Sequence, residues 1–268
     1  MGFGLIVVGD EILSGKRQDK HFSKVIELLS ERGLQLAWAE FVGDDPARLT
    51  TLLRRSFASD DIVFSCGGIG ATPDDHTRQC AAAALGLPLA LHPEGRRLIE
   101  ERIRATSEGA DGAPDFDSPD NRQRFKMAEF PVGASLIPNP YNGIAGFTMA
   151  RHHFVPGFPV MAWPMIGWTL DHLYADLFGS QAEVERSLLV YGQPESALTP
   201  LMEALLRDYP GVRVFSLPSV GDATTRRHIE LGVKGTPEIV ELAFQAVQKE
   251  LLRRGAEIAP LQEGVAPE

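Results

Sequence analysis

The sequence predicts an α/β protein with a three-layer α/β/α arrangement, in which helices cover both faces of a mostly parallel sheet, followed by a small carboxyl-terminal α+β module. Two observations lead to this prediction. Short apolar, β-branched segments alternate with amphipathic segments of helical length from residue 4 onward. The connections between strands are long enough to hold a helix, as parallel strands require. We expect a main domain over residues 1–180, a small domain over 181–255 and a flexible tail over 256–268.

The first half of the chain gives the clearest alternation of strands and helices. Strands are expected at residues 4–8, 34–42 and 62–66. Helices are expected at about 19–32, at 46–59 and through residues 81–85, where Gly86 ends the third one. On the first helix one face carries the apolar side chains of Phe22, Val25, Ile26 and Leu29, so this face should lie on the sheet.

The middle of the chain is less regular. The expected elements are a helix at 93–106, a surface loop or lid at 107–120, a turn or two of helix at 121–127, paired strands between 135 and 147, and a helix from 159 to about 178. His152 and His153 precede the last helix on a short strand. Neighbouring side chains of a strand point to opposite faces, so we interpret both histidines as structural and not as ligands of one metal.

The last quarter of the chain shows a separate β-α-β-β-α pattern. Strands are expected at 186–191, 212–217 and 228–234, and helices at 195–207 and 237–253. Arg226, Arg227 and His228 would suit contact with a phosphate or a nucleic acid. A solvent-exposed strand end explains these three residues better than a phosphate or nucleic-acid contact does.

Composition limits the class of partner. The formal net charge of −10 argues against duplex nucleic acid, which recruits clustered lysine and arginine. No apolar run approaches the roughly 20 residues of a membrane helix, and no basic leader precedes the first strand, so we expect a cytoplasmic protein without a membrane partner. Cys66 and Cys80 match no zinc spacing, and we expect both thiols to be reduced.

The most informative segment is Ile62–Asp75, where an apolar strand leads into Gly67, Gly68 and Gly70. We interpret residues 72–75 as the first turn of the next helix, a position where glycines and a helix N-terminus together favour a phosphate. Asp74 and Asp75 would repel a bare phosphate, so we expect a bridging divalent cation, with Mg²⁺ as the first candidate. The alternative is a capping box from Thr72 to Asp75 without any ligand.

Carboxylates follow each of the first three predicted strands. They are Asp10 and Glu11, Asp44 and Asp45, and Asp74 and Asp75. Because parallel strands end at one edge of a sheet, these loops should meet at one rim, where ligands of such sheets bind. Asp45 before Pro46 is also a good helix cap, and Asp10 is compatible with a simple turn.

Several motifs in one order resemble a known family over residues 3–178. They are Gly9–Gly15, Val42–Asp45, Gly67–Thr77, Asn139-Pro140 and Pro156–Pro159. Together they resemble the amino-terminal domain of competence/damage-inducible CinA proteins, which is similar to the molybdopterin-binding fold of MoaB and Mog.

The resemblance implies a function and a set of site residues. It implies that Asp44 and Asp75 are catalytic and hold the metal. The ligand would be a molybdopterin or nucleotide phosphate held by Asp10, Ser14, Gly67, Gly68, Gly70, Thr72, Thr77, Asn139, Pro140 and Gly157. CinA-type domains are also associated with metal-dependent cleavage of ADP-ribose, and proteins of this fold are often dimers or trimers, so a homo-oligomer is expected.

The chain departs from the family pattern at three places. Met161 stands where the family commonly has an acidic residue, Ala71 stands where proline is usual, and residues 142–146 replace a Gly-Thr-Ala-Pro-Gly segment. Three hypotheses therefore stay open: a molybdopterin- or nucleotide-binding domain, a metal-dependent dinucleotide pyrophosphatase, and a catalytically silent assembly protein. We expect no nicotinamide-mononucleotide deamidase activity, because no segment corresponds to that domain of CinA.

Overall fold

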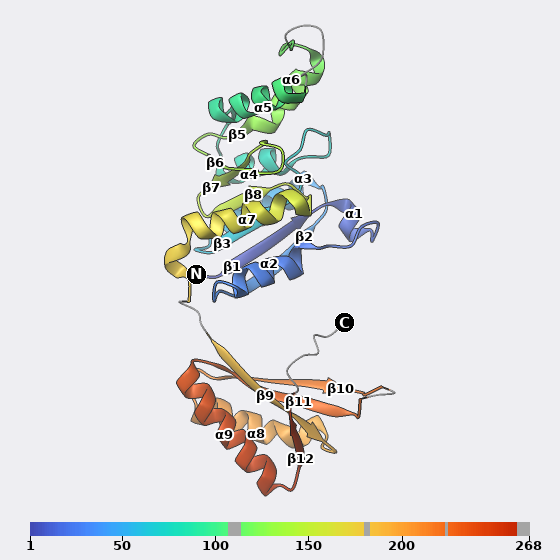
Figure 1. The fold of residues 1–268 in the computed structure, drawn as a ribbon, viewed down its shortest axis with the longest axis vertical. Coiled ribbons are helices and arrows are strands. Elements are labelled where there is room, and N and C mark those ends of the chain that lie inside the picture. The colour runs from blue at the N-terminus through green and yellow to red at the C-terminus, as the bar shows by residue number, and fades with distance from the viewer. Residues whose placement is uncertain (107–113, 180–182, 223–224, 262–268) are drawn as a thin grey trace. The chain divides into compact units, whose positions relative to one another are not determined.

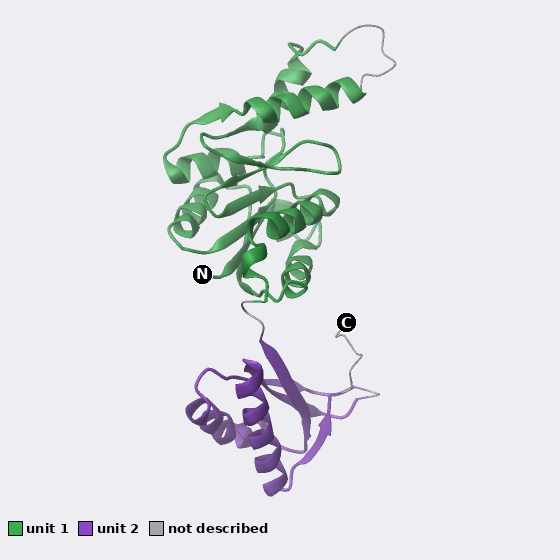
Figure 2. Ribbon diagram, turned by 60° about the vertical axis from the view of Figure 1, so that its left-hand side comes forward, with its two compact units in different colours: residues 1–181 green, residues 182–268 purple. Residues whose placement is uncertain are grey.

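A computed structural model describes residues 1–106, 114–179, 183–222 and 225–261. The chain divides into two compact units, Met1–Gln181 and Ala182–Glu268, which Figure 2 shows in green and purple. The first half of the expected lid at 107–120 lies outside the described residues. Its last residues begin helix α6 (Pro119–Phe125), where Ser118 caps the first turn by accepting a hydrogen bond from Asn121 N–H.

A six-stranded sheet forms the centre of the first unit, with the order β2-β1-β3-β8-β7-β6. The strands are β1 (Phe3–Val8), β2 (Leu36–Val42), β3 (Ile62–Cys66), β6 (Ser135–Ile137), β7 (Gly146–Met149) and β8 (His152–Val155). The first four in the order are parallel, and β7 and β6 add an antiparallel edge. The predicted α/β class with a mostly parallel sheet is therefore confirmed.

Helices cover both faces of this sheet (Figure 1). The helices and short elements are α1 (Asp10–Leu13), α2 (His21–Ser30), α3 (Pro46–Phe57), α4 (Thr77–Leu85), β4 (Leu89–Leu91), α5 (Pro93–Thr106), η1 (Lys126–Ala128), β5 (Glu129–Pro131), α7 (Pro159–Leu173) and η2 (Ala175–Leu177). On β1, Leu5 and Val7 pack toward α2 and α7, whereas Ile6 and Val8 pack toward α3 and α4. This alternation produces two cores, one on each face.

The buried face of α2 matches the predicted one at Val25 and Leu29, which are fully buried, but not at Phe22 and Ile26. Phe22 is 42% exposed and Ile26 39% exposed, whereas His21 is only 5% exposed and lies on the buried face with Val25. The helix begins at His21 because the Asp19 carboxylate accepts hydrogen bonds from the N–H groups of His21 and Phe22. The helical repeat from that start faces positions 21, 25, 28 and 29 inward.

The two histidines of β8 point to opposite faces, as predicted. His152 Nε2 lies 2.8 Å from Ser56 Oγ on α3. His153 lies 2.9 Å from Thr148 Oγ1 and 2.7 Å from the Tyr174 hydroxyl. Burial lowers the pKa of His152 to about 4 and that of His153 to about 3. Both imidazoles are therefore neutral hydrogen-bonding groups inside the fold.

The second unit is a four-stranded antiparallel sheet with the order β10-β11-β9-β12. Its elements are β9 (Val184–Tyr191), α8 (Glu195–Asp208), β10 (Arg213–Ser219), β11 (His228–Gly235), α9 (Pro237–Arg253) and β12 (Glu257–Pro260). Leu231 and Val247 lie in its core, where α8 and α9 pack on the sheet. The predicted tail from residue 256 is wrong at its start, because β12 pairs with β9 and its Ile258 packs against this core.

Among the helices of the described residues, none is long and apolar enough to cross a membrane.

A column of stacked phenylalanine rings gives a stability prediction. The ring centroids of Phe130 and Phe147 lie 4.8 Å apart and those of Phe147 and Phe154 lie 4.4 Å apart. Phe147→Ala removes a fully buried ring, so we expect the first unit to lose about 3–5 kcal/mol of unfolding free energy.

Tryptophan fluorescence during urea denaturation measures this loss, because all 3 tryptophans lie in the first unit, at positions 38, 163 and 168. Leu231→Ala in the core of the second unit is the control and should leave the tryptophan transition unchanged. An unaltered midpoint in Phe147→Ala would contradict the packing described here.

Candidate functional site

Strand register brings four loops to one edge of the large sheet. Val8 pairs with Val42 and Val7 pairs with Cys66, so β1, β2 and β3 end together. The end of β8 joins them, because Cys66 pairs with Val155. Two hydrogen bonds just beyond the strands, Gly9 N–H to Val42 O and Gly67 N–H to Val155 O, both of 3.0 Å, hold the loops there. The loops after these four strands therefore start at the same edge.

The loop after β3 needs glycine at its first two positions. Gly67 has φ +110°, and a Cβ there would lie 2.3 Å from Val8 O. Gly68 has φ +68°, and its Cβ would lie 2.2 Å from Thr77 Oγ1. A side chain at either position would therefore be strained by its backbone and would clash with its neighbours.

The glycine loop leaves a row of backbone donors free. Within the described residues, no hydrogen bond uses the N–H groups of Gly68, Ile69, Gly70 and Ala71. Backbone N–H groups are strong donors that need an acceptor from the protein, water or a ligand. Four consecutive free donors are the local feature that suits an anion such as a phosphate.

The helix after the loop begins later than predicted. Residues 72–75 form a turn, closed by a 3.0 Å hydrogen bond from Asp75 N–H to Thr72 O, and α4 begins at Thr77. The Asp75 carboxylate causes this, because it accepts hydrogen bonds from both the N–H and the hydroxyl of Thr72. The predicted helix start at residues 72–75 is therefore wrong, and the dipole of α4 does not begin at those residues.

Thr77 has an anchoring role in this structure. It is fully buried, its N–H donates to Gly68 O, and its hydroxyl donates to Gly67 O, each at 3.0 Å. Gly70 lies close to Asp75, since a Cβ on Gly70 would lie 2.5 Å from Asp75 Oδ2. Thr77 and Asp75 thus fix the two ends of the glycine loop.

Asp10 and Asp44 form a reciprocal pair at the same edge. Asp10 N–H donates to Asp44 Oδ2 at 2.9 Å, and Asp44 N–H donates to Asp10 Oδ1 at 3.2 Å. Desolvation raises the pKa of Asp44, and the negative charges of Asp10, Glu11 and Asp74 raise it further, against the lowering effect of the hydrogen bond from Asp10. Carboxylates from three loops therefore act on one another.

Asp45 serves a different purpose from its neighbour. It is the N-cap of α3, where its Oδ1 accepts hydrogen bonds from Ala47 N–H at 2.9 Å and Arg48 N–H at 3.0 Å. These hydrogen bonds lower the pKa of Asp45. Its carboxylate therefore stabilises the helix, which confirms the interpretation of Asp45 as a helix cap.

The carboxylates do not make a complete metal site by themselves. In the described parts of the chain, no group of three or more His, Cys, Asp or Glu side chains is placed to hold a metal ion. Asp44 Oδ1 and Asp10 Oδ2 accept no hydrogen bond there. Mg²⁺ commonly takes one or two protein carboxylates and completes its shell with water and phosphate oxygens. The residues present fit a cation that binds together with a phosphate.

The remaining predicted site residues lie on the loops around this edge. Ser14 is exposed at the end of α1. Asn139 is buried, and its amide bonds Asn142 Oδ1, Ile144 O and Tyr141 N–H, so it shapes its own loop. Pro140 is exposed beside it. Gly157 follows β8 and approaches the glycine loop, because a Cβ there would lie 3.4 Å from Gly67 Cα.

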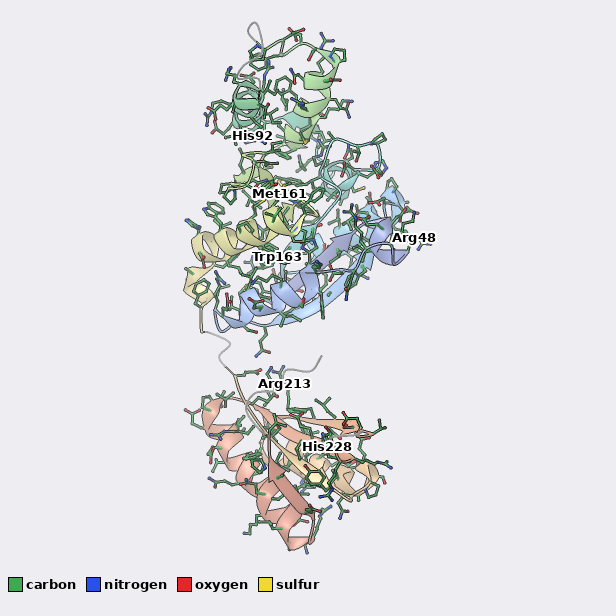
Figure 3. All side chains as sticks on the ribbon, turned by 45° about the vertical axis from the view of Figure 1, so that its right-hand side comes forward. Arg48, His92, Met161, Trp163, Arg213 and His228 are labelled. Carbon is green, nitrogen blue, oxygen red and sulfur yellow. The ribbon has the colours of Figure 1, made fainter. Side chains whose placement is uncertain are left out.

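Met161, at the position where the sequence resemblance implies an acidic residue, lies on α7 (Figure 3). It packs against the core shared by α2 and α7, and Asn142 Nδ2 lies 3.7 Å from its sulfur. The position therefore carries no charge and joins the loop containing Asn139 to α7.

Two residues that the sequence analysis did not single out lie close to the site. Arg78 is 3% exposed, its Nη2 donates to Gly70 O at 2.6 Å, and its Nε and Nη1 have no partner among the described residues. Burial lowers the pKa of Arg78 against the opposing effect of Asp75 and Glu129. His21 lies near Gly157. The inward repeat of α2 could have revealed His21, whereas nothing in the sequence marks Arg78 beyond its place after Thr77.

The clash at Gly68 predicts a loss of stability. Gly68→Ala should lower the unfolding free energy by about 2 kcal/mol or more, because the left-handed backbone and the contact with Thr77 both oppose a methyl group. Gly86→Ala is a matched control, since Gly86 has φ +67° and nothing within 4 Å of its Cβ position. Denaturant titration of both variants measures the difference. Equal losses would show that the contact with Thr77 contributes nothing.

The raised pKa of Asp44 predicts a pH-dependent effect with a definite sign. The ionised carboxylate is less favourable in the fold than in the unfolded chain, so it lowers stability above the ordinary carboxyl pKa. Asp44→Asn keeps an acceptor for Asp10 N–H. It should raise the unfolding free energy at pH 7 by no more than about 0.5 kcal/mol, because water screens a partly exposed carboxyl.

The gain should vanish at about pH 3, where the carboxyl is protonated in both states. Asp45→Asn is the neighbouring control with the opposite expectation, a lower stability at pH 7, because the pKa of Asp45 is lowered. Thermal denaturation between pH 3 and pH 7 tests both. A loss of stability in Asp44→Asn at pH 7 would refute the assigned cause.

Residues 4–175, more than half of the chain, match the family described as "Probable molybdopterin binding domain". A CinA-like protein of Anaeromyxobacter sp. (strain Fw109-5) is 33% identical over 208 residues, which is 74% of this chain and 48% of the relative. A CinA-like protein of Anaeromyxobacter dehalogenans (strain 2CP-1) is 31% identical over 208 residues, again 74% of this chain and 48% of the relative. The chain thus spans about half the length of these relatives.

A solved structure shares the fold of the first unit. The protein CinA of unknown function from Thermoplasma acidophilum aligns with 64% of this chain and 98% of its own chain, at 24% identity and a TM-score of 0.54. The agreement covers the fold alone. The match over residues 4–175 shows that this chain belongs to the family of probable molybdopterin binding domains, and the chain is similar to CinA-like proteins.

Proposed function

We propose that the first unit binds a phosphorylated small molecule, a molybdopterin or a nucleotide, at the edge formed by the glycine loop and the Asp10–Asp44 pair. The observation that carries the proposal is the row of four free N–H groups from Gly68 to Ala71. Backbone N–H groups without a protein acceptor suit the negatively charged oxygens of a phosphate. The family match supports a molybdopterin as the ligand, and a nucleotide phosphate has the same anchoring chemistry.

A divalent cation would join this ligand to the acidic residues. Asp44 and Asp10 would hold the ion through the oxygens that accept no hydrogen bond. The ion would neutralise the negative charges of the carboxylates and the phosphate, which otherwise repel each other. Asp75 has a weaker case as a ligand, because it already holds the turn at Thr72.

Met161 favours binding over turnover. If relatives use an acidic residue at this position for hydrolysis of a phosphoanhydride, this chain lacks it, and a sulfur atom in the core cannot replace a general base or a metal ligand of that kind. Cleavage of a dinucleotide such as ADP-ribose is therefore the second candidate, and assembly without catalysis is the third.

The proposal predicts metal-dependent ligand binding. Calorimetric titration of the full chain with a molybdopterin, ADP-ribose, ATP and FAD, with Mg²⁺ or with a chelator, should show binding of at least one ligand that Mg²⁺ strengthens. Asp44→Asn should weaken the Mg²⁺-dependent part by about tenfold or more, because a charge-assisted contact is lost. Asp45→Asn is the control and should not.

The same samples are assayed for AMP, which separates binding from cleavage. Binding without AMP release supports a binding domain, whereas metal-dependent release would assign the dinucleotide pyrophosphatase instead. Absence of heat with every ligand and ion, and no rise in melting temperature, would overturn the proposal.

A further inference from the structure

Two side chains from outside the glycine loop bind its last two carbonyl groups. Arg78, the second residue of α4, donates from Nη2 to Gly70 O at 2.6 Å. Gln123 of α6 donates from Nε2 to Ala71 O, although 52 positions separate these two residues in the sequence. Helices α4 and α6 therefore hold the end of the loop from two separate parts of the chain.

Contacts of this kind act on the same peptide units that carry the free N–H groups. In a trans peptide the C=O and the N–H of one unit point in opposite directions. A donor bound to Gly70 O therefore directs the N–H of Ala71 away from that donor. Thr77 has the same effect on the two units before it, because it bonds Gly67 O and Gly68 O. The row of free donors is thus aimed by hydrogen bonds made at the opposite ends of its peptide units.

The stability of the fold does not account for an arginine at position 78. The side chain of Arg78 is buried, and its Nε and Nη1 have no partner among the described residues. Burying a cation with unpaired donors is costly, and an apolar side chain of similar size often serves a protein interior equally well. The hydrogen bond to Gly70 O is the contact that an apolar residue could not make. We therefore look to the loop for the role of this guanidinium.

Gln123 lies on a helix that other residues already anchor. Phe125, two positions later, is buried in the core on the α3 and α4 face of the sheet, and the guanidinium of Arg96 lies 5.0 Å from the centroid of its ring. Gln123 itself is exposed, so its side chain covers no part of that core. The place of α6 therefore does not depend on the hydrogen bond from Gln123 to the loop.

We propose that Arg78 and Gln123 are positioning residues of the phosphate site, which act through the loop and do not touch the ligand. Ala71 is held through both of its peptide units, since Arg78 binds the carbonyl of the unit before it and Gln123 binds that of the unit after it. Donors that are oriented before binding lose less conformational freedom when a ligand arrives. This inference rests on the proposed function and deepens it, because it identifies the contacts that prepare the loop for an anion.

The test is nuclear magnetic resonance titration of the isotope-labelled full chain with ADP-ribose and with ATP, each in Mg²⁺, and the tighter of these two probes serves for the variants. In the parent chain the probe should shift the backbone amide signals of residues 68–71. Arg78→Met should weaken probe binding by about tenfold or more, because the Ala71 N–H is no longer held in place. Arg78→Lys keeps a cationic donor for Gly70 O and should bind within about threefold of the parent chain.

Gln123→Met removes the second contact from an exposed position. We expect an unchanged melting temperature, an affinity lower by about threefold, and a shifted Ala71 amide signal in the chain without ligand. A purely structural role would change the melting temperature and not this signal. Arg122→Met is the matched control, because Arg122 is the exposed neighbour whose side chain makes no hydrogen bond or ion pair within the described residues. This control should bind the probe as the parent chain does.

The outcomes distinguish this inference from the proposed function. If the probe binds but Arg78→Met and Gln123→Met bind it as tightly as the parent chain, the positioning role is refuted and the proposed function stands. If neither probe shifts the amide signals of residues 68–71 in the parent chain, the proposed function fails at this loop and the inference falls with it. A loss in Arg78→Lys as large as in Arg78→Met would refute the bond to Gly70 O as the cause. Equal weakening by Arg122→Met would overturn the role of Gln123.

Discussion

The pairing of β1 with both β2 and β3 is the constraint on which the rest of the first unit depends. Because Val8 pairs with Val42 and Val7 pairs with Cys66, the loops after β1, β2 and β3 all begin at one edge of the sheet. A shift by one residue would turn Leu5 and Val7 away from α2 and α7 and would expose apolar side chains. The hydrophobic cores on the two faces therefore fix the register, and the register places Asp10, Asp44 and the glycine loop together.

This placement brings backbone N–H groups, which attract an anion, close to carboxylates, which attract a cation. The free N–H groups after β3 favour an anion, whereas the pKa of Asp44 is raised because its carboxylate is partly desolvated and lies near other carboxylates. Neither feature is needed for the fold, since Thr77 and Asp75 already secure the loop. A ligand that brings both negative oxygens and a cation would satisfy both features at once. For this physical reason we place the ligand site at the edge of the sheet formed by the glycine loop and the Asp10–Asp44 pair.

The fold was predictable from the sequence because strands buried on both faces are continuous apolar segments, as in Ile62–Cys66. The start of α4 was not. The capping-box alternative anticipated the contact between Thr72 and Asp75, but this contact closes a separate turn, and the helix begins only at Thr77, which binds back to Gly67. The strand at Glu257–Pro260 was missed because its stability comes from β9. Acidic site residues were visible as strand-end patterns, but the orphan atoms of Arg78 and His21 appear only after packing.

Arg78 and His21 differ in what their unpaired atoms imply, although both are buried beside the glycine loop. Arg78 already bonds Gly70 O and has Asp75 and Glu129 near enough to affect its pKa, so its positive charge is compensated by the protein. His21 instead lines an open cavity next to Arg17 and Lys20, which form no ion pair in the described residues. Arg78 is a buried cation that bonds a carbonyl oxygen and lies near two carboxylates. His21 donates through Nε2 to Gly157 O, so its unpaired Nδ1 is a buried acceptor without a donor in the described residues. Arg78 therefore holds the glycine loop from the side of α4, whereas His21 ties the start of α2 to the loop after β8 through its one hydrogen bond.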